Sequence, residues 1–134
     1  NVNCMTDSNG VLMGASGGHS DTAAGAKLAV IVVPLIRGRL PMIRDKVQTV
    51  ITPGESIDVI VTERGVAINP KRTELLEKLK DSNLPLYTIQ ELQQMSYDLV
   101  GKPKDIEVSQ EDKDIVAVVE YRDGSIIDLV RKPL

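Results

Sequence analysis

The sequence predicts an α/β fold in which a parallel sheet is followed by a terminal β-hairpin. Three observations support this prediction. A glycine-rich turn and an alanine-rich stretch lead into the apolar run Lys27–Val33, two capped helical patterns alternate with further β-branched runs, and the last two β-rich runs flank an Asp-Gly pair. Continuous apolar runs of this length are typical of strands that are buried on both faces of a parallel sheet.

The N-terminal part is expected to form a strand, a glycine-rich turn, a short helix and a second strand. Ser20 or Asp21 suits the N-cap of the helix, and Pro34 closes the run that follows it. The apolar stretch from 28 to 36 is predicted to be a buried strand. Because two strands joined through a helix lie parallel, this unit implies a parallel sheet.

The middle of the chain predicts strands over 46–51 and 56–62 and a short strand over 66–68. Asn69 and Pro70 then suit the N-cap and the first position of a helix that runs to about residue 81. Thr88 and Glu91 have the spacing of a capping box, and the helix they open is expected to end near Gly101.

The C-terminal residues predict the clearest hairpin of the chain. Two β-rich runs, 115–121 and 125–130, flank Arg122-Asp123-Gly124, and an Asp-Gly pair suits the positive φ angles of a type I′ turn. We expect residues 1–134 to be a single domain or partial domain, the C-terminal segment of a larger subunit. An isolated segment of this kind would leave an unpaired sheet edge, so we expect the chain to self-associate.

The composition excludes several classes of function. The chain has 134 residues, 42% of them hydrophobic, a formal charge of -3, one cysteine and neither Phe nor Trp. Its mixed, mildly acidic charge gives no sign of a nucleic-acid interface. No apolar run reaches the roughly 18 residues of a membrane span, and the single cysteine cannot form an internal disulfide.

The strongest candidate site is the loop Ser16-Gly17-Gly18-His19-Ser20-Asp21. Glycines allow a ligand to approach the backbone, whose N–H groups could receive a phosphate, a carboxylate or the oxyanion of a thioester under attack. The same pattern also fits a tight structural turn. Asp21 could hold the loop by accepting backbone N–H groups or face the ligand.

Other candidates are weaker. His19 is the only histidine, so a relay or a metal site based on histidine would need it, and a local structural role or a ligand contact is the preferred interpretation over direct catalysis. No other residues have metal-ligand spacing. Asn9-Gly10 is read first as a turn and second as a substrate contact. A basic patch could receive an anionic substrate or simply be a solvated loop: Arg37, Arg39, Arg44 and Lys46.

These segments resemble the citrate lyase alpha subunits. The resemblance is carried in order along nearly the whole chain by residues 8–12, 14–26, 34–39, 52–59, 91–94 and 121–124. A weaker likeness reaches the wider coenzyme A transferases, which place a Gly-Gly-x-x-Asp segment between two strands, as at Gly17 to Asp21.

The resemblance implies a CoA-transferase-like parallel sheet domain that exchanges acetate for citrate on an acetyl thioester to give a citryl thioester. The thioester substrate would be acetyl-CoA or the dephospho-CoA-derived prosthetic group of the acyl carrier subunit, with no cofactor bound covalently to this chain. It also implies a cytoplasmic citrate lyase complex with beta and gamma subunits, a homo-oligomeric alpha subunit and a role in citrate fermentation.

The resemblance implies no catalytic residue in this chain. Related transferases use a glutamate whose motif would lie upstream, whereas citrate lyase would form a mixed anhydride of substrate and acyl group directly. Ser16, Gly17, Gly18, His19 and Asp21 are therefore expected to bind the thioester or substrate, with Asn9 and Gly10 as lesser candidates, and the isolated chain is expected to be inactive. Two alternatives stay open: a CoA-transferase or thioester hydrolase for another carboxylate, and a non-catalytic assembly domain.

Overall fold

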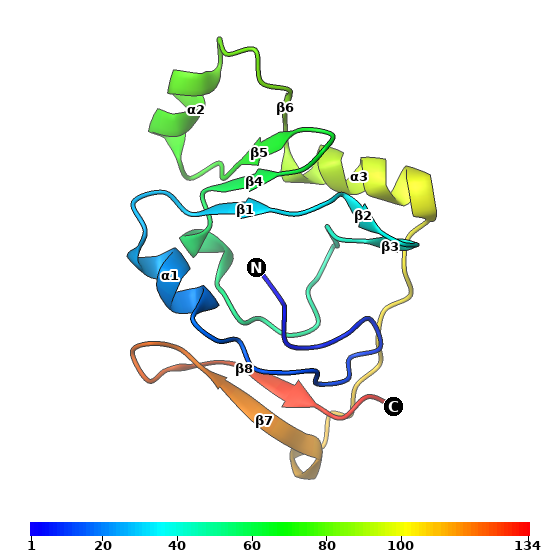
Figure 1. The fold of residues 1–134 in the computed structure, drawn as a ribbon. Coiled ribbons are helices and arrows are strands. Elements are labelled where there is room, and N and C mark those ends of the chain that lie inside the picture. Colours follow the sequence, from blue (N-terminus) through cyan, green and yellow to red (C-terminus); the bar gives the residue numbers. More distant parts are fainter. The chain divides into compact units, whose positions relative to one another are not determined.

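The computed structural model describes all residues from 1 to 134, which fold into two compact units (Figure 1). The first unit comprises Asn1–Gly25, Lys46–Ser56 and Lys104–Leu134, and the second comprises Ala26–Asp45 and Ile57–Pro103. The predicted α/β class and the terminal hairpin are both confirmed. No helix is both long and apolar enough to cross a membrane.

The second unit is built on a four-stranded sheet in the order β1-β4-β5-β6 (Figure 1). Its strands are β1 (Val30–Val32), β4 (Val59–Val61), β5 (Val66–Ile68) and β6 (Leu86–Tyr87). The pairs β1–β4 and β5–β6 are parallel, whereas β4 and β5 are antiparallel because only a short turn joins them. The sheet is therefore mixed.

Strand β1 is not buried on both faces, contrary to the sequence prediction. It lies at the edge of the sheet, and the side chains of Val30 and Val32 are 47% and 80% exposed. An apolar run has the same sequence whether its strand is central or at an edge. After it, β2 (Ile36–Arg37) and β3 (Leu40–Pro41) form a small antiparallel hairpin, with Gly38 at a φ of +63° in the turn.

The two helices of the second unit begin in different ways. Helix α3 (Ile89–Val100) has the predicted capping box: Thr88 Oγ1 accepts from the N–H of Glu91 at 3.2 Å, and the Glu91 carboxylate accepts from the N–H of Thr88 at 2.7 Å. Helix α2 (Thr73–Leu79) begins later than predicted and ends two residues earlier. Asn69 lies before the helix, whose N-cap position is Arg72: its Oδ1 accepts from the N–H of Lys71 at 3.0 Å, and its N–H and side-chain amide donate to the carbonyls of Asp58 and Ile57 at 2.8 Å each.

Two aliphatic clusters form the core of the second unit. Leu92 of α3 is fully buried in the first of them, and both contain residues of β5. Leu99, near the end of the same helix, is 54% exposed. The buried members of the clusters are Leu35, Ile43, Ala67 and Leu92 in one, and Val59, Val66 and Ile68 in the other.

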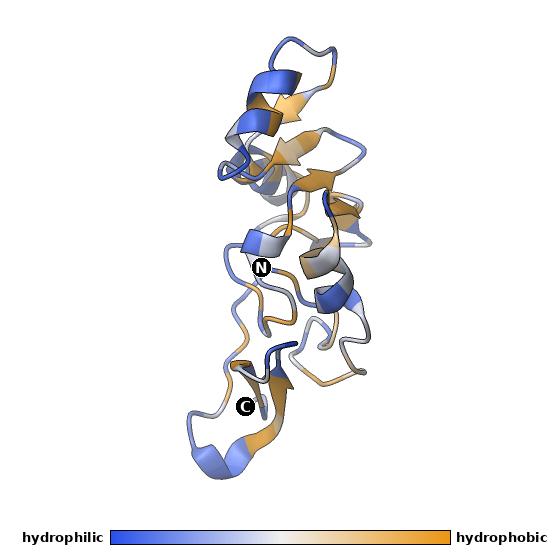
Figure 2. Cartoon of the chain, turned by 90° about the vertical axis from the view of Figure 1, so that its left-hand side faces the viewer, coloured by the Kyte–Doolittle hydropathy of each residue, from blue (hydrophilic) through white to orange (hydrophobic).

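The first unit contains helix α1 (His19–Gly25), the short 3₁₀ helices η1 (Gly54–Ser56) and η2 (Asp112–Asp114), and the hairpin of β7 (Ile115–Glu120) and β8 (Ile126–Arg131). Its core consists of Met5, Ile51, Val119 and Val130. Figure 2 shows the hydrophobic residues mainly on the strands and the hydrophilic ones mainly in the helices and loops.

Two predicted strands of this unit are absent. Before α1 only isolated antiparallel bridges form, Val2–Thr52 and Thr6–Leu12, so the predicted strand–helix–strand unit is wrong. Residues 46–51 also form no strand, since side chains take over part of their backbone bonding: the N–H of Val50 donates to the Asp128 carboxylate at 2.6 Å. A β-branched run becomes a strand only where a second strand lies beside it.

The hairpin turn differs in type from the predicted one. Gly124 has a φ of +85° and no residue other than glycine has a positive φ, so Asp123 cannot occupy a type I′ position. The N–H of Gly124 donates to the carbonyl of Tyr121 at 2.9 Å, and the N–H of Tyr121 donates to the carbonyl of Ser125 at 2.7 Å. This is a three-residue loop, a type I turn followed by a left-handed glycine that forms a bulge.

Candidate functional site

The glycine-rich loop leads directly into helix α1 in the first unit. Gly17 has a φ of +57°, a left-handed conformation that favours glycine. The carbonyls of Ser16 and Gly18 accept from the N–H groups of His19 at 3.4 Å and Thr22 at 2.9 Å. The N–H groups of Gly17 and Gly18 make no hydrogen bond within the chain and are free to donate to a ligand oxygen.

His19 is the first residue of α1 and its ring is half-buried. Its Nδ1 lies 2.8 Å from the Oγ1 of Thr52, which is fully buried. Sequence reasoning singled out His19 and missed Thr52, which is 33 residues away. The histidine therefore makes a structural hydrogen bond to a residue distant in the sequence, and its other ring nitrogen makes none within the chain.

Asp21 does not hold the loop together. No backbone N–H donates to its carboxylate, and its Oδ1 lies 4.0 Å from Nε of Arg122 in the hairpin turn, with both side chains largely exposed. An exposed pair at this distance contributes little to stability. Of the two roles considered for Asp21, the structure excludes the structural one.

Asn9 and Gly10 belong to a separate turn organised by Asp7. The Asp7 carboxylate accepts from the N–H groups of Asn9 at 2.8 Å and Val11 at 3.0 Å, and these bonds lower the pKa of Asp7 below its ordinary value. Gly10 is buried at a φ of +81°, and a Cβ there would lie 3.0 Å from Cγ2 of Ile106. No hydrogen bond joins this turn to the residues 16–21, so its turn role is the one that the geometry supports.

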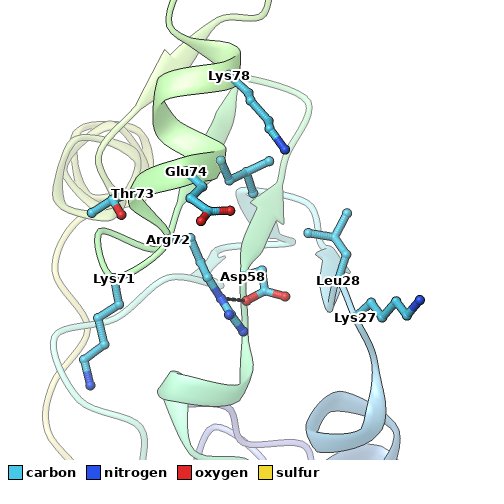
Figure 3. Close-up of a pocket in the computed structure, with 9 residues that line it drawn as sticks. Lys27, Leu28, Asp58, Lys71, Arg72, Thr73, Glu74 and Lys78 are labelled. Atoms are coloured by element: carbon cyan, nitrogen blue, oxygen red, sulfur yellow. Dashed lines mark hydrogen bonds and ion pairs between the residues drawn. The ribbon is translucent and has the colours of Figure 1, made fainter.

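A cleft of about 450 Å³ lies in the second unit, where α2 faces the start of β1 (Figure 3). Four basic and two acidic residues line it: Lys27, Lys71, Arg72, Lys78, Asp58 and Glu74. Figure 3 shows Arg72 reaching Asp58, while Lys27 and Lys71 point away in opposite directions. Because the basic side chains do not converge, the cleft does not define an anion site.

The centre of the cleft is a buried carboxylate. Asp58 is 2% exposed; its Oδ2 accepts from the N–H of Ala29 at 2.8 Å, and its Oδ1 accepts from Nε of Arg72. Sequence reasoning did not single out Asp58. A carboxylate inside the apolar run from 57 to 61 was the signal that it needed a buried partner.

The remaining candidates do not assemble into a site. No group of three or more His, Cys, Asp or Glu side chains is arranged to hold a metal ion, and Cys4 is exposed. Arg37 and Arg39 are exposed on the β2–β3 hairpin, where Arg37 pairs with Leu40 across the two strands.

The chain is thus an α/β protein with a mixed sheet, a terminal hairpin and an exposed glycine-rich loop in which two N–H groups make no hydrogen bond within the chain. The family model for the citrate lyase alpha subunit matches residues 1–133. The chain belongs to the citrate lyase alpha subunit family.

Individual relatives agree with the family match. The chain is 57% identical over 132 residues to the citrate lyase alpha chain of Klebsiella pneumoniae and 49% identical over 132 residues to that of Escherichia coli, in each case over 98% of this chain and 25% of the relative. A solved structure, described as the putative alpha subunit of citrate lyase from Streptococcus mutans in complex with citrate, superposes with a TM-score of 0.93 at 55% identity, covering 100% of this chain and 26% of that one. The chain thus spans about a quarter of the length of these relatives.

Proposed function

We propose that this chain is part of a citrate CoA-transferase, the alpha subunit of citrate lyase, which exchanges acetate for citrate on an acetyl thioester. The observation that carries the proposal is the family match over residues 1–133, together with the solved relative described as a citrate complex. The thioester is acetyl-CoA or the dephospho-CoA-derived group of the acyl carrier subunit. The product is a citryl thioester.

In the proposed reaction a citrate carboxylate attacks the thioester carbonyl, and the carbonyl oxygen takes up negative charge. Collapse of the tetrahedral intermediate expels the thiolate and leaves a mixed anhydride of acetate and citrate. The thiolate then attacks the citryl carbonyl and acetate leaves. No residue of this chain is required as the nucleophile, and any catalytic carboxylate is expected outside it.

The contribution of this chain is the loop Ser16–Asp21. Its Gly17 and Gly18 N–H groups would donate to the carbonyl oxygen as charge develops, an interaction that is stronger in the transition state than in the ground state. Asp21, which is exposed and does not brace the loop, would face the ligand. Asn9 and Gly10 would act at most indirectly, because their contacts lie within their own turn.

The assembly follows from the same proposal. The alpha chain would act in the cytoplasm with a beta subunit that cleaves the citryl thioester and a gamma subunit that carries it, and as a homo-oligomer. A purely assembling role is the second candidate. It is favoured by the exposed apolar residues Val116, Val118 and Ile126 on the β7–β8 hairpin, which are 52% to 58% exposed.

The test is acyl exchange by a full-length alpha chain that carries this sequence. Acetyl-CoA and citrate are mixed with the protein, and citryl-CoA is sought by mass spectrometry. Exchange with other carboxylic acids and not with citrate would show that the substrate is a different carboxylic acid. Absence of exchange with every acid would leave the assembling role.

The loop is tested by one substitution and a matched control. A Cβ at Gly18 would meet only Thr22 Oγ1, at 4.0 Å, so Gly18→Val should fold while its side chain covers the loop backbone. Gly14 has no atom within 4 Å of its Cβ position and no positive φ, so Gly14→Val is the control. Loss of roughly 10²-fold in kcat for Gly18→Val alone would support the loop; equal rates for both variants would refute it.

A further inference from the structure

The hydrogen bond between His19 and Thr52 determines which nitrogen of the histidine carries a proton. Thr52 is completely buried, and its Oγ1 lies 2.8 Å from Nδ1 of the half-buried His19 ring. His19 is the only histidine in the chain. Its second nitrogen, Nε2, makes no hydrogen bond within the chain.

Thr52 is held in place by its own backbone. Its carbonyl accepts from the N–H of Val2 at 3.0 Å, and its N–H donates back to the carbonyl of Val2 at 3.4 Å. The preceding residue, Ile51, is 1% exposed in the core of the first unit. The position of the Thr52 hydroxyl relative to the His19 ring is therefore fixed by the surrounding backbone.

The burial of the hydroxyl fixes the direction of the bond. A threonine hydroxyl has one proton to donate, and burying a donor without an acceptor is unfavourable. The only hydrogen-bond partner of Thr52 Oγ1 is His19 Nδ1. If Nδ1 donated instead, the hydroxyl proton would be buried without an acceptor, so the hydroxyl donates to Nδ1. Neutral His19 then carries its proton on Nε2.

We propose that Thr52 is a positioning residue that holds His19 as the tautomer protonated on Nε2, and that this N–H donates to the carbonyl oxygen of an acyl thioester bound at the Ser16–Gly18 loop. The proposal rests on the proposed function. His19 follows Gly18 directly in the sequence, and its Nε2–H would add a side-chain donor to the two unused backbone N–H groups. Donors of this kind stabilise the oxygen as it becomes negative.

The tautomer is tested without any activity measurement. The chain is labelled with ¹⁵N-histidine, and a long-range ¹H–¹⁵N spectrum at a pH where the ring is neutral is recorded. Because there is one histidine, the spectrum needs no assignment. We expect an unprotonated Nδ1 and a protonated Nε2 in the unsubstituted chain and in Thr52→Ser, and a mixture of tautomers in Thr52→Val. A protonated Nδ1 in the unsubstituted chain overturns the proposal.

The thioester contact is tested in the full-length alpha chain by acetyl-CoA and citrate exchange. Thr52→Val should lower kcat roughly tenfold with little change in KM, less than the loss of a complete oxyanion donor, and Thr52→Ser should retain most of the rate. His19→Gln, which keeps an N–H donor, should be faster than His19→Phe.

Unchanged kcat in Thr52→Val, or equal rates for the two His19 variants, overturns the inference while leaving the proposed function intact. Absence of exchange in the unsubstituted protein refutes the proposed function instead, and the thioester contact falls with it. The ¹⁵N spectrum then still decides between the two directions of the hydrogen bond.

Discussion

Asp58 should be a sensitive position of the second unit. Its carboxylate is 2% exposed and accepts two hydrogen bonds. One comes from the N–H of Ala29, the residue before β1, and the other from Nε of Arg72, the residue before α2. Asp58→Ala removes both acceptors at once. The Ala29 N–H is then buried without an acceptor, because Ala29 is 8% exposed, and this costs about 1–3 kcal/mol.

The ion pair adds less than the backbone bond. The Arg72 side chain is 49% exposed, so water can solvate it after the substitution. Loss of the ion pair should therefore cost only about 0.5–1 kcal/mol. The expected cost of Asp58→Ala is therefore about 1.5–4 kcal/mol of unfolding free energy, a large part of the ordinary stability of about 5–15 kcal/mol. Asp58→Asn keeps an oxygen for Ala29 and should cost about half as much as the alanine variant.

The assay is urea unfolding followed by circular dichroism, with amide hydrogen exchange at Ala29 as the local measurement. The two units can unfold separately, so the exchange rate identifies which one has lost stability. Arg72→Met is the control that removes the ion pair and keeps the acceptor for Ala29. A loss below 0.5 kcal/mol for Asp58→Ala, on the order of a neutral surface substitution, would refute this reasoning.

Three further predictions concern other parts of the fold. Gly65→Ala should lower stability by about 1–3 kcal/mol, because its Cβ would clash with the aromatic ring of Tyr87 in β6, whereas Gly14→Ala should be neutral in the same urea titration. The N–H and hydroxyl of Thr88 lower the pKa of Glu91 below its ordinary 4.5. The capping box should therefore stabilise α3 above pH 4.5 and lose this contribution as the pH falls through the lowered pKa. A Glu91→Gln variant with unchanged acid unfolding, followed by circular dichroism, would contradict this. Val32→Lys should reduce self-association at the β1 edge in light scattering, and Leu84→Lys, at another exposed apolar position, should not; equal masses for the two variants would count against that edge.

The features that the sequence predicted well depend on neighbouring residues. The Thr88–Glu91 capping box, the helix end at Gly101 and the terminal hairpin each rest on residues a few positions apart, whose preferences the fold leaves unchanged. The glycine-rich turn before α1 is also a local pattern, and in it Gly17 has a left-handed conformation. Local chemistry therefore located both the hairpin and the loop.

The features that the sequence missed depend on distant residues. Nothing local distinguishes β1 from a central strand, and its edge position follows from its single neighbour β4. The bond from Thr52 to His19 spans 33 residues, and that from Asp58 to Ala29 spans 29. The sequence shows that Thr52 and Asp58 are polar residues, but it does not show which residues they bond. Those partners can be found only from the folded structure.

The interleaving of the two units sets an order for folding during synthesis. The second unit is complete in sequence once Pro103 has been made, whereas the core of the first unit joins Met5 and Ile51 to Val119 and Val130. On a ribosome that adds about 5–20 residues per second, Met5 waits several seconds for its partners while the second unit can already fold. During that interval Met5 and Ile51 lack the hairpin residues that complete their core, so chaperone binding to the nascent chain should be concentrated on residues 1–25 and 46–56.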